Sequence, residues 1–236
     1  MCNAGDSSPL IDRPAGRALT RIEALARLPD GIDPVAAATM PVAFMTALHG
    51  LEGCAQLQAG ESVLIHGGAG AVGLAALQLA LAAGARVAMT AGTPAKRAFL
   101  RAAGAELVLD SRDPGFADAL RAVWPEGVDV VLNSLAGAAM EHSLGLLKPF
   151  GRFVELGKRD YVENTQASLR PLRRNGSYFA VDVDELPAAR PALAARILGR
   201  IRDGLQDGTL RPLPAAVFGP EEVEAAFRQL QASAHI

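Results

Sequence analysis

Short apolar segments alternate with helix-like segments over most of the chain, and this alternation constrains the fold more than any other feature. The strand-like segments read SVLIH, RVAMT, ELVLD, VDVVLN and GRFVEL, and the first begins at Ser62. Helix-like segments separate them near residues 71–83, 94–103, 116–123 and 140–147. Short apolar strands rich in β-branched residues are typical of parallel sheets covered by helices on both faces. We therefore predict an α/β fold with a doubly wound, Rossmann-type parallel sheet.

A glycine-rich segment, HGGAGAVG, follows the first strand and opens the first helix. It contains the spacing Gly68-x-Gly70-x-x-Gly73. In this motif the first glycine permits a tight turn, the second lets a pyrophosphate approach the backbone, and the third lets the helix pack on the strand. Free N–H groups at the helix N-terminus also favour a bound phosphate. A glycine-rich turn without a ligand is the alternative, but the position between a strand and a helix favours a dinucleotide.

Charged residues near the second and third strands indicate which dinucleotide is bound. An NAD site usually places Asp or Glu on the ribose 2′-hydroxyl about 20 residues after the loop. No Asp or Glu occurs between Ser62 and Ala105. Cationic or hydroxyl side chains follow the two strands instead: Lys96, Arg97, Arg101, Ser111 and Arg112. Any one of the cations could simply lie on the solvated face of a surface helix. Such groups also suit a phosphate dianion, and the absence of an acidic residue favours NADPH over NADH.

The segments that flank the alternating region follow other patterns. Residues 1–16 are polar and without a period, and we expect them to be a disordered end outside the fold. Asp33 is a candidate N-cap, and the apolar stretch 35–51 is expected to form two short helices because Pro41 interrupts it.

After Asn175 the chain changes character. The sequence predicts a strand at SYFAVD, one long helix over 188–206, an extended proline-rich stretch, and an amphipathic helix over 220–231.

Composition excludes several classes of function. The net charge is −2 and the pI about 6.1, whereas a nucleic-acid-binding face should raise the pI of the whole domain. The longest apolar stretch, from Leu74 to Ala83, is shorter than the roughly 20 residues that span a bilayer. Cys2 and Cys54 lie far apart with no signal peptide before them, and the four histidines lack metal-ligand spacing. We therefore expect a cytoplasmic protein with no metal and with neither nucleic acid nor a membrane as its partner.

Four segments in order, MPVAFMTALHGL, AGESVLIHGGAGAVG, VDVVLNSLAG and GRFVELGKRD, resemble the enoyl reductase domains of type I polyketide synthases and animal-type fatty acid synthases. Those domains belong to the medium-chain dehydrogenase/reductase superfamily, alongside quinone oxidoreductases. The resemblance runs from about Arg27 to the C-terminus, and NSLAG with the later GK is its most discriminating part. Zinc-dependent members carry a Cys ligand in the region of residues 41–46, where this chain has none, so it resembles the zinc-free branch.

The resemblance implies a division of the chain into parts. In such enzymes a GroES-like substrate domain precedes the nucleotide domain, and the chain returns to it at its end. We therefore expect residues 17–40 to be a remnant of the substrate domain and a linker, 41–185 to be the NADPH-binding domain, and 186–236 to form a C-terminal helix and the return toward the substrate domain. The chain would then be a fragment of a larger enzyme.

The resemblance also implies which residues bind the cofactor. The pyrophosphate would lie against the glycine loop, at Gly68, Gly70, Ala71, Val72 and Gly73. The 2′-phosphate would be held by Lys96, Ser111 and Arg112. The nicotinamide would be lined by two strand ends, at Asn133, Ser134, Leu135, Ala136, Leu156 and Gly157.

The reaction implied by the resemblance is reduction of the α,β-double bond of an enoyl thioester carried by an acyl carrier protein. It needs a hydride on Cβ from the cofactor, a stabilised enolate oxygen and a proton on Cα. Lys158 and Asp182 match the groups proposed as proton donors in related enoyl reductases. A solvated loop lysine and a turn-capping aspartate are the structural alternatives for these two residues.

Two other functions stay open from the sequence. One is an NADPH-dependent quinone or enone oxidoreductase of the same superfamily, which GK followed by RD disfavours mildly. The other is a cofactor-binding module without turnover. Expected partners are the acyl carrier protein and other domains of a multienzyme synthase, and a homodimer is compatible with the sequence.

Overall fold

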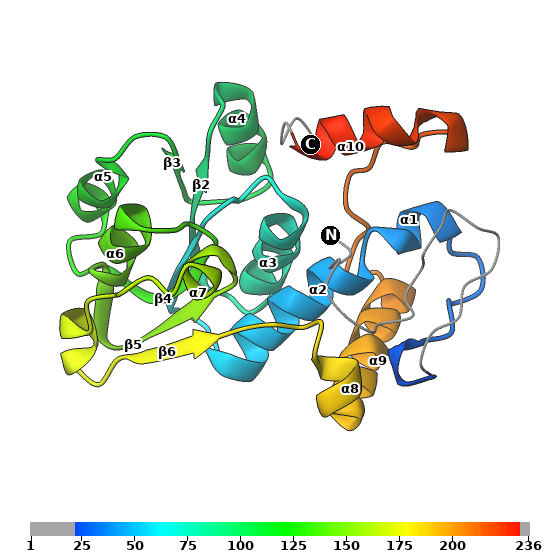
Figure 1. The fold of residues 1–236 in the computed structure, drawn as a ribbon, viewed down its shortest axis with the longest axis horizontal. Helices are drawn as coiled ribbons and strands as arrows, with labels where there is room; N and C mark the ends of the chain where they lie inside the picture. Colours follow the sequence, from blue (N-terminus) through cyan, green and yellow to red (C-terminus); the bar gives the residue numbers. More distant parts are fainter. Residues whose placement is uncertain (1–21, 232–236) are drawn as a thin grey trace.

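The protein is described here by a computed structural model of residues 22–231, so the expected disordered end at residues 1–16 lies outside the described residues. Its centre is a six-stranded parallel sheet in the order β3-β2-β1-β4-β5-β6 (Figure 1). The strands are β1 Ser62–Ile65, β2 Arg86–Ala91, β3 Leu107–Asp110, β4 Val128–Asn133, β5 Leu147–Glu155 and β6 Ser177–Ala180. The order reverses between β1 and β4, which confirms the predicted doubly wound fold and marks where such sheets bind ligands.

Alternation along the strands divides the core between the two faces of the sheet. Val63 and Ile65 of β1 pack on one face, whereas Leu64 packs on the other. The first face is covered by α2 Pro41–Leu48, α3 Ala71–Ala82, α4 Pro94–Ala102 and α9 Pro191–Asp207. The second is covered by α5 Phe116–Val123 and α6 Ala138–Leu144. Because helices bury both faces, the strands read as continuous apolar runs.

The helices before the sheet confirm one expectation and add a feature that was not expected. Asp33 caps α1 Pro34–Ala38 by accepting hydrogen bonds from the Val35 and Ala36 N–H groups at 3.3 and 3.1 Å. Pro41 starts α2, so the apolar stretch forms two helices as predicted. The chain then continues as a π-helix, η2 His49–Cys54.

The predicted single helix over 188–206 is wrong. The structure has α8 Leu186–Ala189 and then α9, because Pro191 has no N–H group and holds Arg190 in a non-helical conformation with φ −138° and ψ 62°. Gly208 ends α9 in the left-handed conformation at φ +78°. The expected helix near 140–147 also begins and ends earlier, as α6, because Leu147 already belongs to β5.

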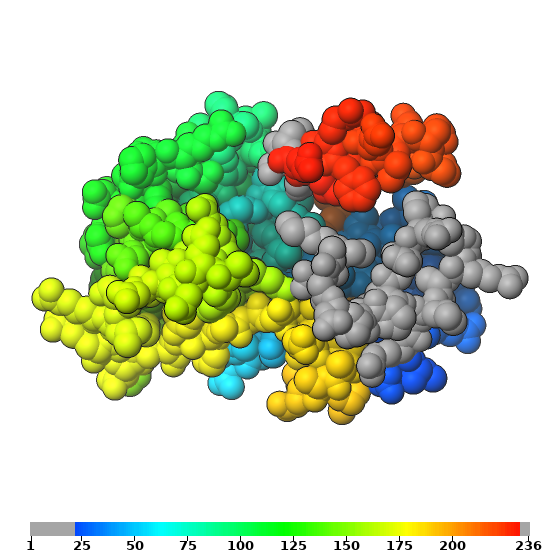
Figure 2. Space-filling model, in the orientation of Figure 1, coloured from blue at the N-terminus to red at the C-terminus, as the bar shows by residue number. Residues whose placement is uncertain are grey.

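The remaining elements are short or peripheral. They are η1 Ile22–Ala24, α7 Arg159–Val162, η3 Arg170–Arg173, η4 Pro220–Glu222 and α10 Val223–Gln231. As predicted, the proline-rich stretch before η4 forms neither helix nor strand. No residue of α10 is buried, and Figure 2 shows this helix as a ridge on the surface beside the sheet. Within residues 22–231, no helix combines the length and apolarity needed to cross a membrane.

Candidate functional site

A cleft of about 880 Å³ lies at the carboxyl ends of β1, β4, β5 and β6. Its strand side is formed by residues of the glycine loop and by residues that end or follow the strands: His66, Gly67, Gly70, Ala71, Val72, Gly73, Leu132, Ser134, Leu156, Lys158, Val181, Asp182, Val183 and Asp184. Its other side is formed by residues of α1, α2 and the turn between them: Ala38, Thr39, Pro41, Val42, Ala43 and Thr46. The cleft therefore spans the point where the strand order reverses, which is the usual ligand site of an open α/β sheet.

The glycine loop is built differently from the sequence interpretation at one position. The left-handed conformation belongs to Gly67, at φ +60°, and not to Gly68. Gly68 is required for packing instead, since a Cβ there would lie 2.9 Å from Cε of Met89. A Cβ on Gly73 would lie 2.5 Å from the Gly68 carbonyl oxygen, so this glycine lets α3 sit on the loop.

Gly70 is the N-cap of α3, and it leaves the first turn of that helix open to the cleft. Its backbone is extended, with φ −83° and ψ 168°, and it has no side chain to accept from the first N–H groups. Gly70 to Gly73 all line the cleft. Backbone N–H groups and the positive end of a helix are thus presented without a Cβ in the way, an arrangement that fits a pyrophosphate.

Two of the residues predicted to hold the 2′-phosphate contact the carboxyl end of β2, and the third lies in the helix that follows it. Ser111 donates its N–H to the Ala91 carbonyl at 3.3 Å. The Arg112 side chain lies over Gly92, where a Cβ would be 2.9 Å from Nε. Lys96 is in the first turn of α4, which follows β2. The contacts thus bring Ser111 and Arg112 to the carboxyl end of β2, and Lys96 belongs to the helix that follows this strand; none of the three lines the large cleft.

Arg97 and Arg101, also candidates from the sequence, serve the fold at this corner. The Arg97 guanidinium forms an ion pair with Asp110 at 2.8 Å and donates to the Ala91 carbonyl at 3.1 Å. Arg101 donates to the Val108 carbonyl at 3.2 Å. Both side chains thus join α4 to β2 and β3.

Asn133 organises the loop after β4 and does not line the cleft itself. It is fully buried, and its amide donates to the Leu135 carbonyl at 2.7 Å while its Oδ1 accepts from the Leu135 N–H at 3.3 Å. Of the residues predicted to line the nicotinamide, Ser134 and Leu156 line the cleft, whereas Asn133, Leu135, Ala136 and Gly157 are not among its lining residues.

Glu155 is a buried carboxylate beside this loop that the sequence analysis missed. It ends β5, is 1% exposed, and accepts from Asn133 Nδ2 at 2.5 Å and from the Gly157 N–H at 2.6 Å. Burial raises the pKa of Glu155 to about 7, against the hydrogen bonds from Asn133 and Gly157, and the charge of Asp160 raises it further. One signal was available, since a glutamate ends the otherwise apolar strand GRFVEL.

The two catalytic candidates lie together in the cleft. Lys158 Nζ is 2.9 Å from Oδ2 of Asp182 and 2.9 Å from Oδ2 of Asp184, and all three side chains are about half exposed. The hydrogen bonds that Lys158 donates to Asp182 and Asp184 raise the pKa of Lys158, so the lysine keeps its charge at neutral pH. Asp182 also accepts the Asp184 N–H at 3.1 Å, so the turn-capping contact is present as well. The sequence analysis did not find Asp184.

His66 is a buried histidine that supports the floor of the cleft. Ser143 Oγ donates to the Ala139 carbonyl at 2.7 Å, so the hydroxyl must accept from His66 Nε2 at 2.8 Å. His66 Nδ1, 3.0 Å from Thr90 Oγ1, is then the acceptor. Burial lowers the pKa of His66 to about 3, which keeps the ring neutral in the native state.

The buried neutral ring predicts how the protein unfolds in acid. In the unfolded state His66 has a pKa of 6.5, whereas in the native state its pKa is about 3. The unfolded state therefore binds more protons between these values, and the free energy of unfolding should fall as the pH drops through this window. The loss attributable to His66 over the whole window is about 5 kcal/mol at most, at about 1.36 kcal/mol for each unit between the two pKa values. His66→Gln, which keeps polar partners for Thr90 and Ser143, should lose less stability than the wild type between pH 7 and 4 in urea unfolding. Titration of Glu155 changes stability in the opposite direction, but by the same amount in the wild type and in His66→Gln. If the two proteins lost the same stability between pH 7 and 4, His66 would not be the cause of the loss.

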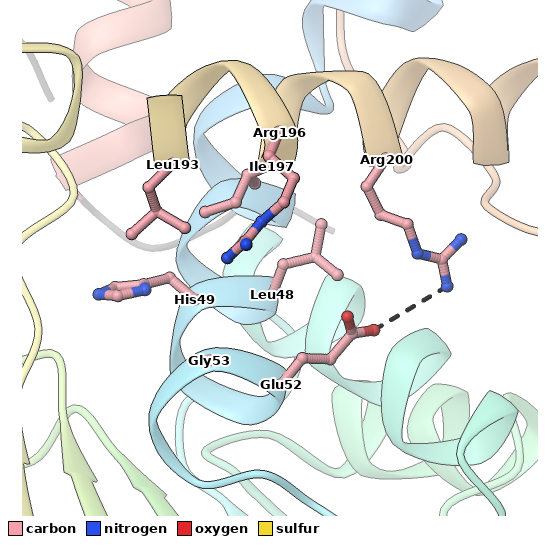
Figure 3. A pocket seen from close by; sticks show the side chains of 8 residues that line it. All are labelled: Leu48, His49, Glu52, Gly53, Leu193, Arg196, Ile197 and Arg200. Carbon is pink, nitrogen blue, oxygen red and sulfur yellow. Dashed lines mark ion pairs between the residues drawn. The ribbon is translucent and has the colours of Figure 1, made fainter. Parts of the chain in front are cut away.

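A second cavity, of about 290 Å³, lies between the π-helix and α9 (Figure 3). Figure 3 shows the side chains of Leu193 and Ile197 pointing from α9 toward the helix that carries Leu48 and His49, and Arg200 paired with Glu52 at 3.9 Å. The cavity shares no lining residue with the large cleft.

The described residues give no sign of a metal centre. Nowhere in residues 22–231 do three His, Cys, Asp or Glu side chains gather as metal ligands would.

Comparison with known proteins places the chain in a family. A family model described as zinc-binding dehydrogenase matches residues 71–190. Among curated proteins, the phthioceranic/hydroxyphthioceranic acid synthase of Mycobacterium tuberculosis is 46% identical over 202 residues, which is 85% of this chain and 9% of that protein. The chain spans about a tenth of the length of the curated relatives it matches.

Solved structures also match over most of the chain, among them two enoyl reductases. The CurK enoyl reductase is 38% identical with a TM-score of 0.82, over 92% of this chain and 65% of that chain. The nucleotide-binding subdomain of the enoyl reductase domain of PpsC from Mycobacterium tuberculosis is 42% identical with a TM-score of 0.69, over 73% of this chain and 97% of that chain. The resemblance found in the sequence is confirmed: the chain belongs to the polyketide synthase enoyl reductase domains of the medium-chain dehydrogenase/reductase superfamily.

Proposed function

We propose that this chain is the NADPH-binding part of an enoyl reductase that reduces the α,β-double bond of an enoyl thioester bound to an acyl carrier protein. The observation that carries the proposal is the single cleft that joins the glycine loop at Gly70 to the Lys158–Asp182 ion pair. A cofactor that lies along this cleft with its pyrophosphate at the glycine loop would place its nicotinamide near the Lys158–Asp182 ion pair. Membership of the enoyl reductase family supports the same reaction.

The cleft supplies residues for the pyrophosphate and the nicotinamide of NADPH, and the residues proposed for the 2′-phosphate lie outside its lining. The open first turn of α3 suits the pyrophosphate, and the corner formed by Lys96, Ser111 and Arg112 suits the 2′-phosphate. The loops after β4 and β5, with Ser134 and Leu156, suit the nicotinamide, which supplies the hydride when bound.

The chemistry beyond hydride transfer is assigned to Lys158 and Asp182. The ammonium of Lys158 remains charged at neutral pH and can donate a hydrogen bond to the developing enolate oxygen. Asp182 orients that ammonium through the 2.9 Å contact. Delivery of the proton to Cα falls to one of these two groups.

The parts of the chain are proposed to divide the work as the resemblance implies. Residues 41–185 are the proposed NADPH-binding domain, 17–40 a remnant of the substrate domain and a linker, and 186–236 a C-terminal helix and the return toward the substrate domain. Other domains of a multienzyme synthase and its acyl carrier protein are the proposed partners. A homodimer and a cytoplasmic location stay predictions.

Cofactor selectivity gives the first test. We expect NADPH to bind at least about tenfold tighter than NADH, a difference of ~1.4 kcal/mol, which is modest for charged contacts to a phosphate. Lys96→Ala should weaken NADPH binding and leave NADH binding unchanged in fluorescence titrations. Arg228→Ala, which removes an exposed cation on α10, is the matched control and should change neither. Equal affinities of the wild type for the two cofactors would contradict the assignment.

Turnover by the full-length parent tests the reaction itself. With NADPH present, the parent should reduce a crotonyl thioester, and this chain alone should bind NADPH but turn over poorly. Reduction of a quinone and not of the thioester would assign the protein to a quinone oxidoreductase function. Binding of NADPH by the parent without reduction of either acceptor would make it a cofactor-binding module.

A further inference from the structure

Glu155 occupies a position between the two loops that form the nicotinamide side of the cleft. It ends β5, with the loop that contains Leu156 and Lys158 following directly, and it contacts the loop after β4 through Asn133. Its side chain is 1% exposed, so no solvent satisfies the carboxylate. The protein must supply its hydrogen bonds, and it does so from both loops.

The hydrogen-bond pattern requires two acceptor oxygens on this side chain. Asn133 Nδ2 has two hydrogens, one given to the Leu135 carbonyl at 2.7 Å and the other to Glu155 Oε2 at 2.5 Å. The second oxygen, Oε1, accepts from the Gly157 N–H at 2.6 Å. A glutamine or a protonated glutamic acid would turn one acceptor into a donor that faces another donor. Turning the Asn133 amide over would not help, because its Oδ1 already accepts from the Leu135 N–H.

We propose that Glu155 is a positioning residue whose ionised carboxylate ties the loop after β4 to the loop after β5, so that the nicotinamide half of the site keeps its shape only while this carboxylate carries its charge. The inference rests on the proposed function, because it assumes that the nicotinamide lies against these two loops. Glu155 itself does not line the cleft.

The charge on Glu155 should change within the physiological pH range. Burial raises its pKa to about 7, the hydrogen bonds from Asn133 and Gly157 oppose this, and the Asp160 carboxylate raises it. The charge of Glu155 in turn raises the pKa of two nearby tyrosines, Tyr161 of α7 and Tyr178 of β6, whose hydroxyls lie 3.2 Å apart and whose pKa values are raised mainly by burial. As the pH falls through about 7, Glu155 takes up a proton and one contact between the loops is lost.

Glu155→Gln separates the two halves of the cofactor site. NADPH should bind about tenfold more weakly to this variant, because a hydrogen bond to a charged group is lost and a buried donor is left unpaired. The probe 2′-phospho-ADP-ribose has the adenosine half but no nicotinamide, so it should bind the variant within about twofold of the wild type. Isothermal titration of both ligands, with thermal melting to confirm the fold, gives the comparison.

Cofactor affinity measured against pH distinguishes a role that depends on the charge of Glu155 from a role in packing alone. NADH is the ligand here, because the 2′-phosphate of NADPH itself titrates near pH 6. Wild-type affinity for NADH should fall as the pH drops from 8 to 6, and Glu155→Gln should show no such fall. Asp160→Asn removes the charge beside Glu155 yet keeps an acceptor for the Gly137 N–H, which lies 3.2 Å from Oδ2 in the wild type. It should shift the midpoint of the fall to lower pH.

Gly157→Ala is the second variant, in case Glu155→Gln does not fold. A Cβ at Gly157 would lie 2.8 Å from Glu155 Oε1 and displace the carboxylate without changing any charge. It should also weaken NADPH more than 2′-phospho-ADP-ribose. Unchanged NADPH affinity in both folded variants, or a pH profile of the wild type that Glu155→Gln reproduces, overturns the inference. Failure of the wild type to bind either ligand counts against the proposed function instead.

Discussion

Gly70→Val is expected to abolish NADPH binding while the protein stays folded. The Gly70 backbone, with φ −83° and ψ 168°, is extended and open to any residue, and a Cβ there would meet only the Gly67 carbonyl oxygen, at 3.3 Å. That side chain would fill the space in front of the first turn of α3, where the pyrophosphate must approach. We expect affinity to fall at least about a hundredfold, or ~2.7 kcal/mol, in isothermal titration.

Two other glycines provide the controls. Gly199→Ala, on α9, meets nothing within 4 Å and should bind NADPH normally with a slightly higher melting temperature. Gly73→Ala should fail through its fold, because its Cβ would lie 2.5 Å from the Gly68 carbonyl oxygen. Tight NADPH binding by a folded Gly70→Val protein would mean that the phosphate lies elsewhere.

Lys158→Ala, made in the full-length parent, should lower kcat more than it raises KM. A contact made mainly to the developing enolate stabilises the transition state and not the bound substrate, so its loss appears in kcat. The expected loss is on the order of a hundredfold, the lower end of what a general acid contributes. Asp182→Asn should act in the same direction, because it loosens the ammonium that it holds at 2.9 Å.

The double variant, Lys158→Ala with Asp182→Asn, tests whether the two residues act independently or share the delivery of the proton. If Lys158 and Asp182 share the delivery of the proton, the double variant should lose little more than the worse of the two single variants. Arg159→Ala, an adjacent cation paired with Glu163 outside the cleft, should keep a near-normal kcat. Steady-state kinetics on a crotonyl thioester measure all four proteins. A near-normal kcat in the double variant would leave solvent as the proton source.

The sheet was predictable from the sequence because its signals are local. Apolar runs such as VDVVLN and the glycine loop mark β4 and the turn into α3 without help from the rest of the chain. The break at Pro191 was also visible, and the expectation of one long helix gave too little weight to a residue that lacks an N–H group.

The site was predictable only where a motif carried it. Asp184 belongs to no recognised spacing, and Glu155 gives only the weak signal of a glutamate at the end of an apolar strand. Their contacts form where separate strand ends meet: Glu155 touches Asn133, and Asp184 touches Lys158. The sequence also could not show that Gly67, and not Gly68, takes the left-handed conformation. The residue that leaves no room for a side chain at Gly68 is Met89, which belongs to the neighbouring strand. Contacts of this kind are set by the folded sheet and not by neighbours along the chain.

The central position of β1 has a consequence for synthesis on the ribosome. One edge of β1 pairs with β2, which follows within about 25 residues, but the other edge pairs with Val130 to Leu132 of β4. At roughly 5 to 20 residues per second, the nascent chain carries the second edge unpaired for several seconds. All four residues of β1 are buried in the folded protein, and three of them are apolar. An exposed edge of such a strand can pair with other chains, so it favours aggregation during translation. A nascent chain that stalls before β4 should therefore leave this edge of β1 open to chaperones, and synthesis of β4 should cover it.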